Sequence, residues 1–183
     1  MDELIDILDE NGNSTGRTCL KSKAHLKGLF HPTVHVWFYT CDGSILFQKR
    51  AHDKDTFPSL WDVSVAGHIG AGEDFVLAAL RETEEEIGLS IESSDLKEIG
   101  IFRSQHKHSD TLIDNEFHHV FICELKVPLS NLKRQESEVD DVQLFSLTGF
   151  KTRVTENQLE GFVPHERNYY HLVIAEIEKE FNS

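Results

Sequence analysis

The segment from residue 67 to residue 88 constrains this chain more than any other feature. Its residues follow the pattern G-x5-E-x7-R-E-x2-E-E-x-G. The fixed positions are Gly67, Glu73, Arg81, Glu82, Glu85, Glu86 and Gly88. Seven fixed positions coincide by chance on the order of once in 10^8 starting points. We refer to residues 67–88 as the box segment.

The spacing of the box glutamates predicts a shared helix face. We expect a helix from Asp74 to Ile87, in which Glu82, Glu85 and Glu86 fall within an arc of about 100°. A neighbouring stripe would anchor the helix on a core, and it contains Val76, Ala79, Leu80, Thr83 and Ile87. Three carboxylates on one face repel one another, so the arrangement favours a bound cation. Mg2+ and Mn2+, which prefer oxygen ligands and bridge carboxylates to phosphates, are the expected cofactors.

Composition alone would assign the same glutamates to a solvated helix face. The flanking glycines favour the metal site instead. Gly67, Gly70 and Gly72 form a loop ahead of the helix, where backbone groups can approach a metal or phosphate, and Gly88 follows at the expected C-cap.

The box segment resembles the Nudix box. The resemblance implies that Arg81 and Glu73 pair and orient the segment, while Glu82, Glu85 and Glu86 bind the metal with help from the backbone of Gly67. It also implies an α/β fold, specifically an α/β/α sandwich with a mixed sheet and a loop-helix-loop box. Thr83 stands where the family usually has an aliphatic residue.

Composition agrees with a single domain over residues 1–183, because the chain is 39% hydrophobic and 27% charged. A net charge of −14 disfavours a nucleic-acid surface. The three widely spaced cysteines indicate neither a disulfide framework nor a zinc knuckle. We find no long apolar run and no leader, so a cytoplasmic protein without a membrane partner is expected. Nothing in the sequence indicates the oligomeric state.

Hydrophobic alternation and turn signals predict several strands and two helices. The expected strands are 4–8, 33–40, 45–48, 62–66, 97–103, 117–125 and 142–145, with a hairpin turn at Asp42-Gly43. A closing helix is expected over 166–181. The polar stretch 104–115 is predicted to be a loop, which would leave His106 and His108 on the surface. His118 and His119 alternate on a strand, so at most one can reach the site.

Outside the box, the resemblance narrows to the branch related to isopentenyl-diphosphate isomerase. The supporting segments are 47–50, 54–58, 61–62 and 64–68. In the isomerases, histidines and an acidic pair hold a transition metal, and the matching residues here are His25, His31, His68, Asp114 and Glu116. The isomerases have a catalytic cysteine just before the box glycine, but this chain has Ala66. They also depart from the full box glutamate set, which is complete here.

The predicted chemistry is therefore hydrolysis of a diphosphate bond in a small molecule, such as a nucleoside diphosphate-linked compound or a related organic pyrophosphate. Glu86, Glu85 or Glu116 would accept the proton of the attacking water, and Glu86 is favoured. Candidate substrate-binding residues are Lys49, Arg50, Lys54 and Phe57. Two alternatives stay open: an isomerase-like enzyme, and a ligand-binding module without turnover. The sequence does not identify the substrate.

Overall fold

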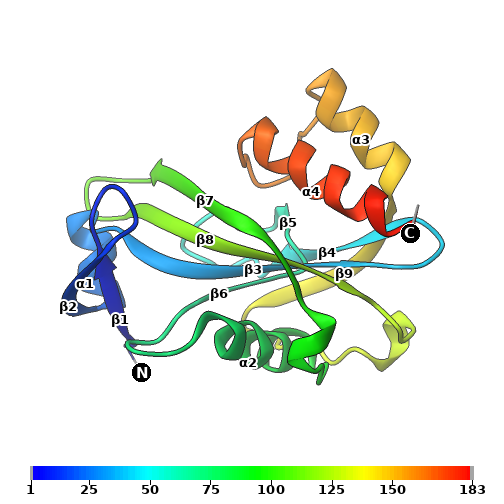
Figure 1. Ribbon diagram of the computed structural model, residues 1–183. Coiled ribbons are helices and arrows are strands. Elements are labelled where there is room, and N and C mark those ends of the chain that lie inside the picture. The colour runs from blue at the N-terminus through cyan, green and yellow to red at the C-terminus, as the bar shows by residue number, and fades with distance from the viewer. Residues whose placement is uncertain (1, 182–183) are drawn as a thin grey trace.

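A mixed seven-stranded sheet forms the centre of the computed structural model, which describes residues 2–181 (Figure 1). Its strands are β3 (His31–Tyr39), β4 (Ser44–Arg50), β5 (Trp61–Asp62), β6 (Val65–His68), β7 (Lys97–Lys107), β8 (Ile113–Glu124) and β9 (Val139–Ser146). The main path is β5-β4-β3-β8-β7, with β6 paired to β3 and β9 paired to β4. β3 and β8 run parallel, which brings residues about 85 positions apart into register, such as Thr33 and His118.

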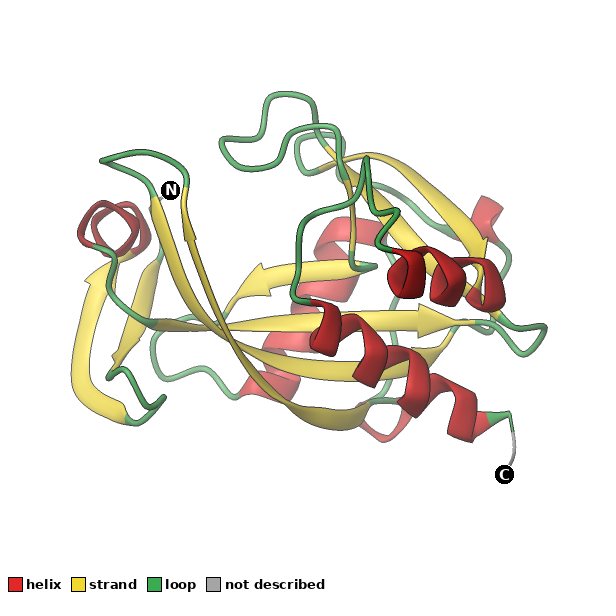
Figure 2. Ribbon diagram, turned by 90° about the horizontal axis from the view of Figure 1, so that it is seen from above, coloured by secondary structure: helices red, strands yellow, loops and turns green. Residues whose placement is uncertain are grey.

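Helices cover both faces of this sheet. Helix α2 (Phe75–Ile87) packs on one face over a core that includes Val34, Val36 and Phe121. Helices α3 (Leu147–Glu156) and α4 (Arg167–Glu180) lie on the other face, over an aromatic core that includes Trp37 and Phe47 (Figure 2). The α/β/α sandwich implied by the family resemblance is therefore confirmed.

A small N-terminal unit stands beside one end of the sheet (Figure 1). It contains the hairpin β1 (Leu4–Leu8) and β2 (Ser14–Leu20), followed by helix α1 (Lys21–Lys27). Two short 3-10 helices, η1 (Ser93–Asp95) and η2 (Leu129–Asn131), complete the elements. The sequence predicts β1 but not β2, α1 or α3, because these three segments are largely polar and show only weak hydrophobic periodicity.

The strand predicted over 62–66 is divided in two, since β5 pairs with β4 whereas β6 pairs with β3. The buried hydroxyl of Ser64 lies at the division. It donates to the carbonyl of Leu46 at 2.5 Å and accepts from the amide of Phe38 at 2.9 Å. The Ser64 side chain thus replaces backbone hydrogen bonds where β3 and β4 separate. A sequence pattern of alternating residues does not predict such a side-chain bridge.

The predicted loop over 104–115 is wrong. β7 continues to Lys107 and β8 begins at Ile113, so only 108–112 connect them. The two strands stay paired, for example Ser104 with Glu116 and His106 with Asp114. The alternation of apolar and polar residues that indicates a strand is missing here, because the residues are polar on both faces of the hairpin. Within residues 2–181, no helix is long and apolar enough to span a membrane.

Candidate active site

One face of the sheet provides the floor of a cavity of about 510 Å³. Alternate residues of β3 and β8 point to the same face, and this places Thr33 and His35 beside Glu116 and His118. The box segment forms another wall of the same cavity with Gly67 and all three predicted metal-binding glutamates, Glu82, Glu85 and Glu86.

The box helix is capped at both ends. The side chain of Asp74 accepts hydrogen bonds from the amides of Val76 and Leu77 at 2.9 and 3.2 Å. Gly88 ends the helix in the left-handed conformation, at φ 66°. Thr83 fits its buried position because its hydroxyl donates to the carbonyl of Ala79 at 2.7 Å. These contacts fix the helix, and with it the direction of the glutamates.

Arg81 joins the loop and helix of the box. Its guanidinium binds both carboxylate oxygens of Glu73, at 2.9 and 2.8 Å, and donates to the carbonyl of His68 at 3.0 Å. It also donates to Glu82 at 2.7 Å and to Glu85 at 3.3 Å. The expected ion pair between Glu73 and Arg81 is thus present. Hydrogen bonding to Glu73 is the main cause of an increase in the pKa of Arg81, so its charge is permanent.

Glu82 and Glu86 are buried, whereas Glu85 is exposed. Glu86 accepts hydrogen bonds from the amide of Ala66 and from Gln48 Nε2, both at 3.1 Å. Burial raises the pKa of Glu86 to about 8 and also raises the pKa of Glu82. Two buried carboxylates beside an exposed third are more stable as anions when a cation lies among them.

Gly67 leaves room for the carboxylate of Glu82. A β-carbon at position 67 would stand 2.0 Å from Cδ of Glu82, so no larger residue fits without moving the glutamate. The oxygen donors and the close approach of backbone to carboxylate fit Mg2+ or Mn2+. The residues present therefore suit the cation that the box implies.

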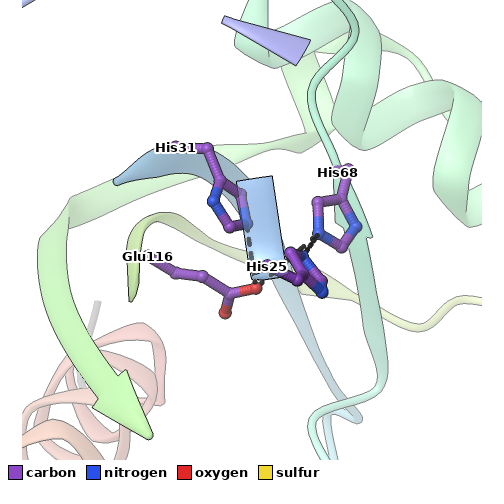
Figure 3. A group of neighbouring side chains, drawn as sticks. All are labelled: His25, His31, His68 and Glu116. Carbon is purple, nitrogen blue, oxygen red and sulfur yellow. Dashed lines mark hydrogen bonds and ion pairs between the residues drawn. The ribbon is translucent and has the colours of Figure 1, made fainter. Parts of the chain in front are cut away.

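A second group of ligand-type side chains lies beside the same cavity, and all of its members except His31 line it. It contains His25, His31, His68 and Glu116, whose donor atoms all lie within 4.8 Å of one another. Figure 3 shows the four side chains converging from different elements. His25 Nε2 is 3.2 Å from His68 Nε2, and Glu116 Oε1 is 3.4 Å from His31 Nε2 and 3.7 Å from His68 Nε2.

Asp114 does not belong to this group. It lies 3.4 Å from Nδ1 of His25 and 2.9 Å from Nε2 of His108, so it contacts His25 on the opposite side from His68. Three histidines and one carboxylate form a donor set typical of a transition metal rather than of Mg2+. Asp114 then resembles the outer carboxylates that commonly orient metal-binding histidines.

The predicted substrate-binding residues have different environments. Arg50 is held by Asp62 at 2.9 Å and by two contacts to Thr56 at 3.0 Å. Lys54 pairs with Glu138, and Phe57 packs edge-on against His108. All three line the cavity. Lys49 is not among the described residues that line it.

Sequence reasoning missed several residues of the cavity. Lys21, at the start of α1, lines it, as do Gln48, Asp62 and His165. His165 Nε2 donates a hydrogen bond to Asp62 Oδ1 at 2.9 Å. We expected at most one of His118 and His119 to reach the site, and of these two only His118 lines the cavity. The surface assignment of His106 is wrong, because its ring also lines the cavity.

Comparison with known proteins agrees with the box geometry. The NUDIX domain family model matches residues 29–172. A Nudix hydrolase of Clostridium acetobutylicum, described as uncharacterised, is 31% identical over 201 residues, with 94% of this chain and 96% of that protein covered. Nudix hydrolase 3 of Arabidopsis thaliana is 32% identical over 171 residues, and this chain spans 22% of its length.

An isopentenyl-diphosphate Delta-isomerase of Serratia proteamaculans is 33% identical over 122 residues, which cover 67% of this chain and 66% of the isomerase. Among solved structures, DR0079 from Deinococcus radiodurans matches with a TM-score of 0.66 at 18% identity, covering 84% of this chain and 90% of that one. The structural match shows the shared fold. The chain therefore belongs to the Nudix family, in the branch that includes proteins named isopentenyl-diphosphate isomerase.

Proposed function

We propose that this protein is a Mg2+- or Mn2+-dependent hydrolase that cleaves a diphosphate bond in a small organic pyrophosphate. The observation that carries the proposal is that Glu82, Glu85 and Glu86 line a single cavity together with Gly67. That cavity, at about 510 Å³, has a size typical of small-molecule sites.

The bound cation would neutralise phosphate oxygens and lower the pKa of an attacking water. The chain's own residues have separate roles in the proposal. Glu82 and Glu85 hold the cation, while Arg81 positions both of them through its contacts at 2.7 and 3.3 Å. Glu86 accepts the proton from water, and its hydrogen bonds from Ala66 and Gln48 fix the carboxylate. Glu116 is the alternative base.

Basic side chains on the cavity wall would bind the outer phosphate. Lys21 and Lys54 both line the cavity. The guanidinium of Arg50 already makes three hydrogen bonds, one to Asp62 and two to Thr56, so we assign it mainly to holding the loop that carries Phe57. Lys49 is not needed in this arrangement.

We propose in addition that His25, His31, His68 and Glu116 hold a transition metal. The convergence of their donor atoms within 4.8 Å supports this assignment. In that role Asp114 would orient His25.

The histidine group also favours a second candidate function, isomerisation of an allylic diphosphate, since relatives with that name share this branch. Two features oppose it. Ala66 occupies the position where the isomerases have a cysteine. Only four apolar side chains, those of Phe57, Ala66, Leu112 and Val163, occur among the described residues that line the cavity. A hydrocarbon substrate would gain little from such a lining.

The decisive experiment measures diphosphate hydrolysis with and without Mg2+ or Mn2+. A panel of diphosphate compounds is incubated with the protein, and phosphate release is followed after coupling to a phosphatase. We expect metal-dependent release that falls at least about 100-fold in Glu86→Gln and Glu85→Gln. The matched control is Glu84→Gln, which changes an exposed glutamate of the same helix and leaves the rate unchanged.

Isopentenyl diphosphate belongs in the same panel, with its isomer followed by NMR. Conversion to dimethylallyl diphosphate would replace the hydrolase with the isomerase. Binding without turnover of any compound would favour the ligand-binding module. A rise in melting temperature with Mg2+ that disappears in Glu85→Gln would place the cation at the box in all three cases.

A further inference from the structure

Three histidines line a part of the cavity that neither the box segment nor the histidine group at His25 accounts for. We call His35, His118 and His165 the histidine wall. The rings of His35 and His118 are stacked with centroids 4.0 Å apart, and His165 meets them at 5.4 and 6.2 Å. The three side chains therefore form one continuous surface.

Each ring of the histidine wall has one nitrogen fixed by a protein partner. His118 Nδ1 is 2.7 Å from Thr33 Oγ1, and His35 Nδ1 is 2.7 Å from the hydroxyl of Tyr169. His165 Nε2 is 2.9 Å from Asp62 Oδ1. These contacts hold the rings in fixed orientations, so their remaining nitrogens are preorganised.

His118 provides the strongest sign of a missing partner. Its side chain is only 3% exposed, and Nε2 has no hydrogen-bond partner among the described residues. Buried polar nitrogens of this kind are nearly always satisfied in proteins. Because His118 lines the cavity, a ligand group is the natural partner.

The wall suits an uncharged ligand group. Asp62 and Arg50 lie beside it and are paired with each other at 2.9 Å, and Asp62 also binds His165. The third charged group, the carboxylate of Glu116, lies 3.7 Å from His118 Nδ1 and is an anion. Among residues 2–181, no unpaired cation lies beside the wall to attract a phosphate. A hydrocarbon group would deprive the histidine nitrogens of hydrogen bonds to water and offer none in return. This loss opposes its binding.

We propose that the histidine wall is the subsite for the non-phosphate part of the substrate, and that this part is an uncharged, hydroxyl-rich group such as a sugar. The inference rests on the proposed diphosphate hydrolase function. In the bound state, hydroxyls donate to or accept from the ring nitrogens that Thr33, Tyr169 and Asp62 do not bind. The diphosphate then extends toward the box glutamates within the same cavity.

The test compares two diphosphates of similar size, glucosyl diphosphate and cyclohexyl diphosphate, which differ mainly in their hydroxyl groups. Binding is measured by calorimetry with Mg2+ in the full chain carrying Glu86→Gln, and turnover is measured in the wild-type chain. We expect the glucosyl compound to bind at least about tenfold more tightly, with a corresponding preference in kcat/KM.

His118→Phe should abolish this preference, because it keeps a ring but removes both nitrogens. The matched control is His119→Phe on the same strand, since His119 does not line the cavity and stacks on Phe75 at 4.7 Å. The control should keep the preference. If His118→Phe fails to fold, His165→Phe replaces it, and the preference of the wild-type chain is itself a sufficient measurement.

Equal or tighter binding of the cyclohexyl compound would overturn the inference, as would an unchanged preference in folded His118→Phe. If both compounds are hydrolysed equally well, the hydrolase stands and the histidine wall is not a sugar subsite. If the glucosyl compound binds preferentially but no diphosphate is hydrolysed with either metal, the subsite stands and the proposed reaction is wrong.

Discussion

Glu82 places its carboxyl group in the space that a side chain on Gly67 would occupy. A β-carbon at residue 67 would lie 2.0 Å from Cδ and 2.3 Å from Oε1 of Glu82. The glycine at this position of the box is therefore required by the position of the Glu82 carboxylate, to which we assign metal binding in the proposed function. The two residues come from the loop and the helix of the same segment.

Gly67→Ala should consequently damage catalysis more than folding. The added methyl group displaces Glu82, and a displacement of about 1 Å in a catalytic constellation can cost about 100-fold in rate. We expect that loss in metal-dependent kcat, with a change in melting temperature of only a few degrees. Gly149→Ala is the control, because its new β-carbon would meet Ser146 Cβ at an ordinary 3.7 Å. A fully active Gly67→Ala protein would refute the steric argument.

Asp62→Asn should remove an acid-sensitive part of the stability. Burial alone would raise the pKa of Asp62, but the hydrogen bond from His165, with the charges of His165 and Arg50, lowers it far below its usual value of 3.8. Because the folded-state pKa is depressed, the stabilisation is present above pH 3.8 and is lost as the pH falls below it. We expect the variant to lose about 3 kcal/mol of unfolding free energy at pH 7.

Denaturant unfolding between pH 7 and pH 2 measures this effect. The gap between wild type and Asp62→Asn should narrow as the pH falls below about 4. Asp53→Asn, at an exposed position near the same cavity, should follow the wild-type curve. A gap that stays constant across the range would show that Asp62 does not contribute through its charge.

The histidine group should bind a transition metal independently of the box. Titration with Co2+, followed by its visible absorption, should show a site that persists in Glu85→Gln. His31→Gln should weaken that site at least about 100-fold. Asp114→Asn should weaken it about tenfold, because in our proposal Asp114 orients His25 without binding the metal. His52→Gln, at an exposed position, should leave it unchanged. Equal Co2+ affinity in wild type and His31→Gln would contradict the assignment.

Ser64→Ala should destabilise the sheet where β3 and β4 separate. The change leaves the amide of Phe38 and the carbonyl of Leu46 without their side-chain partner, which we expect to cost about 2–3 kcal/mol. Thr83→Val provides the contrast. Its hydroxyl binds the carbonyl of Ala79, which also lies within the helix hydrogen-bond ladder, so the loss should stay below about 1 kcal/mol. Urea unfolding of both variants compares the two values.

The local parts of this protein followed from its sequence. The helix of the box, its C-cap at Gly88 and the common direction of its glutamates depend on residues a few positions apart, whose geometry is fixed by the helical repeat. The pair Glu73 and Arg81, eight residues apart, joins the loop to the helix and was implied by the resemblance to the Nudix box. Most strands were also predicted, since their alternation reflects burial on one face.

The tertiary structure alone decided how these parts meet. The parallel pairing of β3 with β8 brings Thr33 to His118, and the packing of α2 on the sheet brings Gln48 to Glu86. Pairing register between distant strands is set by global packing, which no local pattern encodes. The same reason explains the failed prediction over 104–115, where both faces of the hairpin are polar because one of them faces the cavity.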